Sequence, residues 1–214
     1  MNTYYYKYPM IRQTKKHFKY DKHFAQQYSQ HAEFDQIYNF FIDSFVKIHG
    51  EPIGSLVDLC CGTADISRKF KSNFPNLDVV GYDESFEMIS AANPTDITFV
   101  NKPIQSINKV FDNIISNNAY HHFDNISEFW SAVNRISHSK SKILISDVIR
   151  PVHEEDVLQI VNDVLGPNSI FETAFALSLK SAYTEDELKT HIRLLNLVII
   201  DTPIDNYKLF FIHN

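Results

Sequence analysis

The chain has 214 residues, 44% of them hydrophobic and 21% charged, which favours one folded domain and excludes a disordered or fibrous protein. No apolar run reaches the roughly 18 residues of a membrane-spanning helix, and the N-terminal residues lack the apolar stretch of a secretory leader. The two cysteines, Cys60 and Cys61, are adjacent and cannot form an ordinary structural disulfide, as suits a reducing compartment. We therefore expect a cytoplasmic protein.

The net charge of −6 is unevenly distributed. Residues 1–22 hold six basic side chains and one acid, a charge of +5, which leaves −11 for the rest of the chain. An acidic body argues against a broad nucleic-acid footprint, which needs clustered Lys and Arg. The basic arm also carries a tyrosine cluster between Tyr4 and Tyr8, which keeps nucleic acid open as an alternative. The cluster could instead clamp an aromatic substrate, or be a flexible arm that packs on a partner.

The predicted elements begin with one or two amphipathic helices over 20–49. From residue 53 onward, short apolar runs alternate with stretches of helical spacing. The predicted strands are 55–60, 77–82, 97–101, 112–117, 142–148, 197–202 and 207–213. The predicted helices between them are 64–72, 85–92, 124–138, 153–165 and 184–195.

This alternation predicts an α/β fold with a doubly wound, seven-stranded, mostly parallel sheet. Only the four residues 203–206 separate the last two strands, which is too short for a parallel crossover. We therefore expect the last strand to be antiparallel. The expected organisation is a basic, aromatic arm and helical lid over 1–49 and a cofactor-binding catalytic domain over 50–214, acting as a single domain.

The ligand of such a sheet binds beyond the carboxyl ends of the strands. The first predicted strand ends in a turn of small residues around Gly62, which lets the backbone approach a ligand. Asp83 follows 21 residues later at the end of the second strand, where a carboxylate can accept both hydroxyls of a ribose. Asp83 could alternatively be a strand-end carboxylate that caps the next helix.

The turn does not fit a phosphate-bearing ligand. The three glycine positions of G-x-G-x-x-G hold Cys60, Gly62 and Asp65, and no G-x-x-x-x-G-K-[ST] occurs. Asp65 would place negative charge where a pyrophosphate has to lie. A ligand with a ribose, positive charge and no phosphate suits this turn better, and S-adenosylmethionine is such a ligand.

Four segments resemble the motifs of class I S-adenosylmethionine-dependent methyltransferases. They are V-D-L-C-C-G-T-A-D at 57–65, G-Y-D-E-S-F-E-M-I at 81–89, F-D-N-I-I-S-N-N-A-Y-H-H-F at 111–123 and I-S-D-V-I-R-P at 145–151. They occur in the order and spacing of the family, and the resemblance extends over roughly 20–213. The chain looks most similar to the small-molecule branch that includes ubiquinone and menaquinone methyltransferases. The resemblance implies a Rossmann-like fold and in-line transfer of a methyl group to an O, N or C nucleophile of a small molecule.

The resemblance also implies which residues contact the cofactor. Asp58 and the backbone around Cys60 and Gly62 would hold the methionine part, and Asp83 the ribose. The full implied set is Tyr28, Asp58, Cys60, Gly62, Asp83, Glu84, Met88, Ile104, Asn117 and Asn118. Two positions depart from the family pattern: Ala64 replaces the last glycine of the turn, and Pro103 stands where many relatives carry an acid.

On the substrate side, the resemblance implies His121 and His122, with Tyr120 beside them. A histidine can deprotonate a hydroxyl or amine nucleophile, so either is a candidate general base. The alternative is one histidine packed on the sheet and one on the surface. Arg150 is a candidate for a substrate carboxylate or, equally, for a structural pair with Asp147.

The acceptor pocket is expected to be aromatic, formed by the N-terminal segment and residues 150–183. No metal is expected, because adjacent cysteines without further ligands cannot complete a zinc site. Two other functions stay open. One is an RNA or protein methyltransferase, although the chain lacks N/D-P-P-[YF] after the fourth strand. The other is a non-methylating relative or partner subunit. The sequence leaves a homodimer open.

Overall fold

The computed structural model describes residues 10–14, 20–30, 35–93, 96–192, 195–202 and 208–214. The tyrosine cluster at 4–8, most of the basic arm and the 203–206 connection lie outside the described residues. Among the helices of the described ranges, none has the length and apolar character needed to cross a lipid bilayer.

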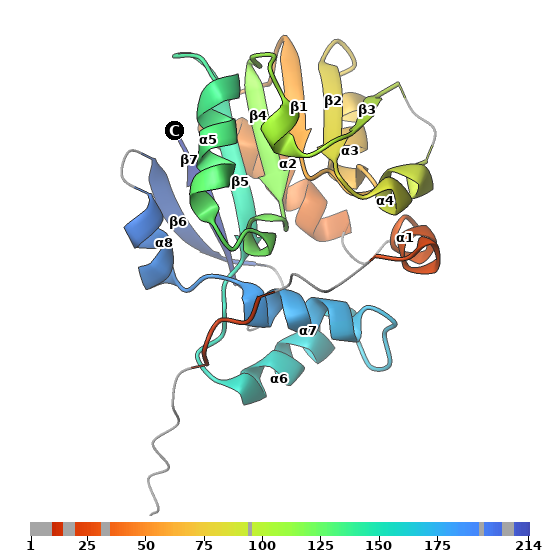
Figure 1. Cartoon of the computed structure of the whole chain (residues 1–214), viewed down its shortest axis with the longest axis vertical. Helices are drawn as coiled ribbons and strands as arrows, with labels where there is room; N and C mark the ends of the chain where they lie inside the picture. The colour runs from red at the N-terminus through yellow and green to blue at the C-terminus, as the bar shows by residue number, and fades with distance from the viewer. Residues whose placement is uncertain (1–9, 15–19, 31–34, 94–95, 193–194, 203–207) are drawn as a thin grey trace, which may run out of the picture.

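Seven strands form one sheet, as the sequence predicted (Figure 1). They are β1 (Ser55–Leu59), β2 (Asp78–Asp83), β3 (Thr98–Asn101), β4 (Asn113–Asn117), β5 (Lys142–Val148), β6 (Asn196–Asp201) and β7 (Lys208–His213). Their spatial order is β3-β2-β1-β4-β5-β7-β6. Strand β7 runs antiparallel to both β5 and β6, and the pairs among β1 to β5 are parallel. The predicted fold class, including the antiparallel last strand, is confirmed.

Helices cover both faces of the sheet. They are α1 (Lys22–Tyr28), α2 (Asp35–His49), α3 (Asp65–Asn73), α4 (Phe86–Ala91), α5 (Ile126–Ile136), α6 (Glu154–Leu165), α7 (Glu172–Ser181) and α8 (Glu185–His191). Two short 3-10 turns, η2 (Ile104–Ser106) and η3 (Tyr120–His122), follow β3 and β4. Helix α7 lies inside the 150–183 region, where the sequence reasoning assigned aromatic residues but no helix after 165.

Alternating side chains along the strands build two cores, one on each face. In β1, Leu56 belongs to the core that contains α2 and α3, and its neighbour Val57 belongs to the core that contains α5 and α8. In β7, Phe211 belongs to the core with α2 and α3, and Phe210 belongs to the core with α5 and α8. The chain passes from β1 to β2 and β3 on one side and returns to β4 on the other, so the strand order reverses between β1 and β4. This switch point is where the fold leaves room for a ligand.

Candidate active site

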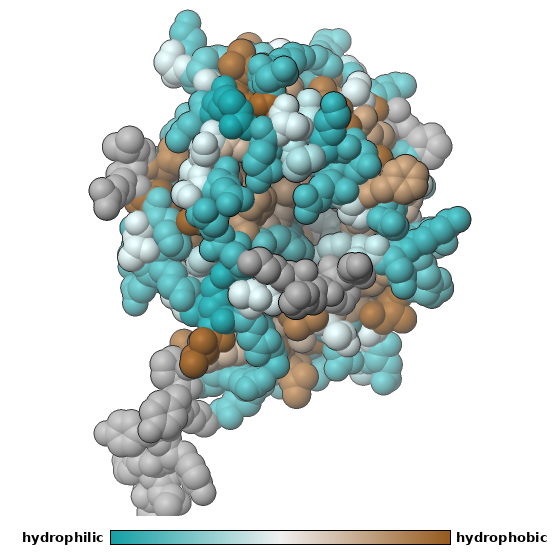
Figure 2. All heavy atoms as spheres, in the orientation of Figure 1, coloured by the Kyte–Doolittle hydropathy of each residue, from teal (hydrophilic) through white to brown (hydrophobic). Residues whose placement is uncertain are grey.

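A cavity of about 860 Å³ lies at the carboxyl ends of β1, β2 and β4, between these strands and helices α1 and α7. Its volume falls within the range of small-molecule sites. Hydrophilic residues dominate the face of the molecule seen in Figure 2. The cavity brings together all ten residues predicted to contact the cofactor: Tyr28, Asp58, Cys60, Gly62, Asp83, Glu84, Met88, Ile104, Asn117 and Asn118.

The turn after β1 is shaped by backbone conformations that side chains rarely adopt. Cys60, Gly62 and Ala64 have φ angles of 59°, 55° and 60°. A Cβ on Gly62 would lie 3.3 Å from Met88 Cε, so the residue has little room for a side chain. Ala64 adopts the left-handed conformation directly before α3, so the turn accommodates a β-carbon at the position of the family's last glycine. Non-glycine residues in this region cost on the order of 1 kcal/mol or more, and such strain collects at ligand sites.

Asp83 connects this turn to the next strand. Its Oδ2 accepts a hydrogen bond from the Gly62 amide and its Oδ1 one from the Ser85 amide, each at 2.8 Å. Burial raises the pKa of the carboxyl, and the two amide bonds partly offset that rise. Each carboxylate oxygen has a second lone pair, so Asp83 can serve the turn and still accept from a ligand. Ser85, rather than Asp83, caps α4 by accepting from the Met88 amide.

Asp58 is a second acid in the cavity wall, and its side chain is almost fully buried in β1. Ser67 Oγ donates to Asp58 Oδ2 at 2.6 Å. Burial raises the pKa of Asp58 to about 7, the Ser67 bond opposes the rise, and the nearby Asp83 and Asp65 add to it. A carboxyl of this kind gains most from a cationic partner, because a positive charge offsets the cost of ionising it in a buried place.

This pKa predicts how the stability of the ligand-free protein depends on pH. The folded state binds the Asp58 proton more tightly than the unfolded chain, whose aspartates titrate near 3.9. This proton therefore adds to the free energy of unfolding at low pH. That added stability, on the order of a few kcal/mol, is lost as pH rises from about 4 to 7. Asp58→Asn should flatten that dependence. Urea unfolding of both proteins across this range measures it, and parallel curves would contradict the assignment.

The cavity as a whole is acidic. Seven carboxylates line it: Asp58, Asp65, Asp83, Glu84, Glu87, Asp124 and Glu128. Among the described residues that line it there is neither lysine nor arginine. The side-chain oxygen of Asn118 is buried in the wall and accepts no hydrogen bond from the described residues. This acidic wall, with an unpaired amide oxygen, suits a ligand that is positively charged and carries hydrogen-bond donors.

Aromatic side chains form the wall opposite the strand ends. Phe24 and Tyr28 of α1 meet Phe171 edge-on, with ring centroids 5.4 and 5.7 Å apart. Phe175 of α7 and Tyr20 extend the same wall. The expectation of an aromatic pocket from the N-terminal segment and the 150–183 region is consistent with this arrangement. Sequence reasoning missed Tyr20 and the contribution of Tyr38, because no local pattern shows which tyrosines of a helical segment face a cavity.

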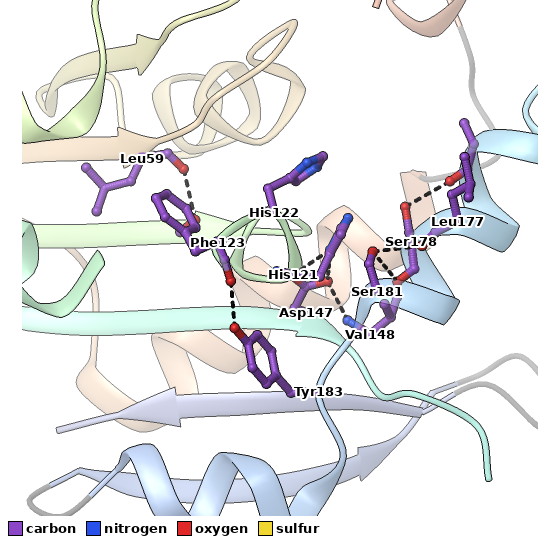
Figure 3. A network of polar contacts seen from close by, with 12 residues as sticks. Leu59, His121, His122, Phe123, Asp147, Val148, Leu177, Ser178, Ser181 and Tyr183 are labelled. Carbon is purple, nitrogen blue, oxygen red and sulfur yellow. Dashed lines mark hydrogen bonds and ion pairs between the residues drawn. The ribbon is translucent and has the colours of Figure 1, made fainter. Parts of the chain in front are cut away.

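The side chains of the two histidines of η3 lie in different environments. His122 lines the cavity, and its Nε2 lies 3.3 Å from the hydroxyl of Tyr20. His121 points away from it, is 1% exposed, and is held through Nδ1 by both carboxylate oxygens of Asp147 at 2.8 Å (Figure 3). The structure therefore does not support His121 as a general base, because its ring is buried against a carboxylate away from the cavity.

Tyr120 and Arg150, which were predicted as substrate residues, are not among the residues that line the cavity. Tyr120 is fully buried, and the Trp130 indole donates to its hydroxyl at 3.0 Å. The Arg150 guanidinium donates to the Ala182 carbonyl at 2.8 Å and pairs with Glu187 at 2.7 Å. Arg150 is thus a structural residue, although its partner is Glu187 rather than Asp147.

The cysteines Cys60 and Cys61 both line the cavity as free thiols. Burial raises the pKa of each thiol well above its usual value, and the neighbouring carboxylates add to the rise. Both are therefore poor nucleophiles. The described residues contain no group of three or more His, Cys, Asp or Glu side chains arranged to hold a metal ion.

Comparisons with known proteins match this architecture. Residues 56–139, from β1 through α5, match the family model of a methyltransferase domain. No curated protein matches the sequence. The plantazolicin methyltransferase BpumL, solved in complex with a triazolic desmethylPZN analog and SAH, is similar over 89% of this chain and 88% of its own, with 15% identity and a TM-score of 0.65. An SAM-dependent methyltransferase from Aquifex aeolicus is similar over 91% of this chain and 98% of its own, with 12% identity and a TM-score of 0.65.

Proposed function

We propose that this methyltransferase transfers the methyl group of S-adenosylmethionine to an O, N or C nucleophile of a small molecule. The chain is an enzyme with a methyltransferase domain, and S-adenosylmethionine is its cofactor. The acceptor class is what the proposal adds. The observation that carries it is the combination, in one cavity, of an acidic strand-end half and an aromatic half.

The residues of the acidic half suit the cofactor. We propose that Asp83 accepts the ribose hydroxyls, with Glu84 and Met88 beside the adenosine. Ile104, which is 3% exposed, offers an apolar surface for adenine. Asp58 and the turn at Cys60 and Gly62 would hold the methionine end. Asn117, Asn118 and Tyr28 complete the lining.

The aromatic half supports a small apolar or aromatic acceptor without phosphate or carboxylate groups. An anionic acceptor would need a positive partner, and the described lining residues include no lysine or arginine. BpumL, which has the same fold, was solved with a triazolic desmethylPZN analog and SAH together. We also propose that the enzyme is most similar to the ubiquinone and menaquinone methyltransferase branch, and that it acts in the cytoplasm.

Methyl transfer requires little of the protein except that it positions the acceptor against the cofactor. The sulfonium of the cofactor supplies an already activated methyl group. The cavity aligns the acceptor with it, and orientation of this kind can account for roughly 7–11 kcal/mol of a barrier. Helix α1 lies beside α4 (Figure 1), and its Phe24 and Tyr28 line the cavity, where apolar rings disfavour water.

His122 is the proposed proton acceptor for a hydroxyl or amine nucleophile. His122→Ala should lower the turnover number about 100-fold, the lower range of general-base effects, and leave cofactor affinity unchanged. His138→Ala is the matched control, since His138 is a partly exposed histidine outside the cavity. Equal turnover of His122→Ala and the wild-type enzyme would assign His122 to the wall alone.

The proposal is tested in two steps. Calorimetric titration with S-adenosylmethionine and its demethylated product should show binding to the acidic half. Radiolabelled methyl transfer should then label a component of a metabolite extract, but not total RNA or protein. Labelled RNA or protein would establish the alternative acceptor classes. Binding without transfer to any of the three pools would favour a non-methylating relative.

A further inference from the structure

We propose that Arg12 is a positioning residue that fixes His122 in the cavity wall. The inference rests on the proposed function, because it assigns Arg12 to the acceptor side of that site. Arg12 belongs to the basic N-terminal segment, which the sequence analysis connected with nucleic acid or an aromatic substrate. In the structure its guanidinium turns inward to the short turn η3, and its side chain is 16% exposed.

The guanidinium holds the backbone on both sides of His122. Arg12 Nη2 donates to the carbonyl of His121 at 3.1 Å and to the carbonyl of Phe123 at 3.2 Å. Arg12 Nη1 lies 3.7 Å from the carboxylate of Asp124. The three contacts span the residues that immediately precede and follow His122. They therefore fix the path of the chain at that residue through its backbone neighbours.

Two further contacts anchor the arginine itself. Its Nε donates to the Ser181 carbonyl at the end of α7, at 2.8 Å, and its Cζ lies 4.1 Å from the centre of the Tyr183 ring. The hydroxyl of Tyr183 donates to the Phe123 carbonyl at 2.6 Å (Figure 3). Arg12 and Tyr183 thus bind the same carbonyl from two separate parts of the chain, and Arg12 joins η3 to α7, which carries part of the aromatic wall.

The same N-terminal segment also reaches the ring of His122. Tyr20 places its hydroxyl 3.3 Å from His122 Nε2, and its ring packs edge-on at 6.1 Å. Backbone bonds hold the segment on either side of Arg12: the Met10 amide donates to Val152 O and the Gln13 amide to Lys180 O. Arg12 therefore sets the backbone of η3, and Tyr20 contacts the imidazole that this backbone presents.

Lysine cannot replace this arginine. Only a planar guanidinium offers several donors in a fixed geometry while stacking on an aromatic ring. A short 3-10 turn leaves carbonyls at its end without partners inside the turn, so the Arg12 guanidinium supplies the missing hydrogen-bond donors. This makes the proposal specific to Arg12 rather than to positive charge at that position.

Arg135 offers a matched control on the cofactor side. Its guanidinium also binds backbone carbonyls, donating to Ile107 at 3.0 Å, Ile104 at 3.3 Å and Gln105 at 2.9 Å. Ile104 and Gln105 line the cavity near the proposed adenine position. The two arginines therefore make the same kind of contact on opposite sides of one cavity, and their variants should affect different ligands.

The test compares Arg12→Ala, Arg12→Lys and Arg135→Ala, each as the full chain with S-adenosylhomocysteine. Arg12→Ala should shift the NMR signals of the His122 imidazole and change the dissociation constant for S-adenosylhomocysteine less than about twofold. Arg135→Ala should leave the His122 signals in place and raise that constant about tenfold, as expected for lost charge-assisted bonds. Arg12→Lys should restore the wild-type His122 signals only in part. Once an acceptor is identified, Arg12→Ala should lower the turnover number at unchanged cofactor affinity.

Unshifted His122 signals in folded Arg12→Ala would overturn the proposal. So would a loss of cofactor affinity equal to that of Arg135→Ala, which would indicate a general structural role. If Arg12→Ala does not fold, the Arg12→Lys spectrum decides alone, since full restoration would show that charge suffices. Failure of the proposed function is seen separately, as a wild-type enzyme that transfers no methyl group to any acceptor pool.

Discussion

Replacing Asp83 with alanine should weaken the binding of S-adenosylmethionine and of its demethylated product by about 1.5–3 kcal/mol, the usual range for losing hydrogen bonds to a charged acceptor. Two effects combine in this loss. The ribose loses its proposed acceptor, and the amides of Gly62 and Ser85 lose the oxygens that fix the turn. Calorimetric titration measures the result directly.

Two controls separate these effects. Asp83→Asn keeps one acceptor oxygen and removes the charge, so it should fall between wild type and alanine. Asp78→Ala removes an exposed acid from the same strand. The partner of Asp78 is the exposed Lys109, 3.5 Å away, so this change should leave the affinity for S-adenosylmethionine unchanged. An Asp83→Ala protein with wild-type affinity would show that the ribose lies elsewhere.

Replacing Asp147 with alanine should lower the free energy of unfolding by about 3–5 kcal/mol, because several buried hydrogen-bond donors lose their acceptor at about 1–3 kcal/mol each. Asp147 has no exposed surface. It accepts from the His121 amide at 2.8 Å, from His121 Nδ1, and from the Val148 amide at 2.7 Å. Its loss would leave the histidine ring and two amides buried without their acceptor. Urea unfolding gives the value.

The double variant tests whether His121 is structural. Asp147→Ala combined with His121→Ala should cost less than the sum of the two single changes, because the pair shares one interaction. Strict additivity would mean that the contact contributes little. His121→Ala should also retain cofactor binding, unlike Asp83→Ala, because His121 lies outside the cavity.

Strand positions were predictable because apolar runs and connection lengths are local properties of the chain. The short connection after residue 202 forced an antiparallel last strand, and β7 pairs in that way with both neighbours. Helix α7 was not predicted, because its apolar residues do not lie on one stripe. Phe175 and Leu179 face the core, while Ala176 and Leu177 between them are only partly buried.

The lining of the proposed cofactor half of the cavity was predictable for a related reason. Its residues follow strand ends, and the topology carries strand ends to one edge of the sheet. The acceptor half depends on which way side chains turn after β4. Three consecutive residues point in different directions: Tyr120 enters the core, His121 pairs with Asp147, and His122 lines the cavity. The 3-10 geometry of η3 decides this, and no spacing rule in the sequence specifies it.

Helix α1 has only seven residues, and Ala25 is the one it buries fully. Isolated helices shorter than about 12 residues are marginal in water, so α1 owes its shape to the docking of Phe24 and Tyr28 on Phe171. Undocking this segment would therefore also melt it. We therefore expect exchange of the proposed cofactor on that side to require local unfolding of this segment, so the resistance of residues 22–28 to proteolysis should rise when the cavity is occupied.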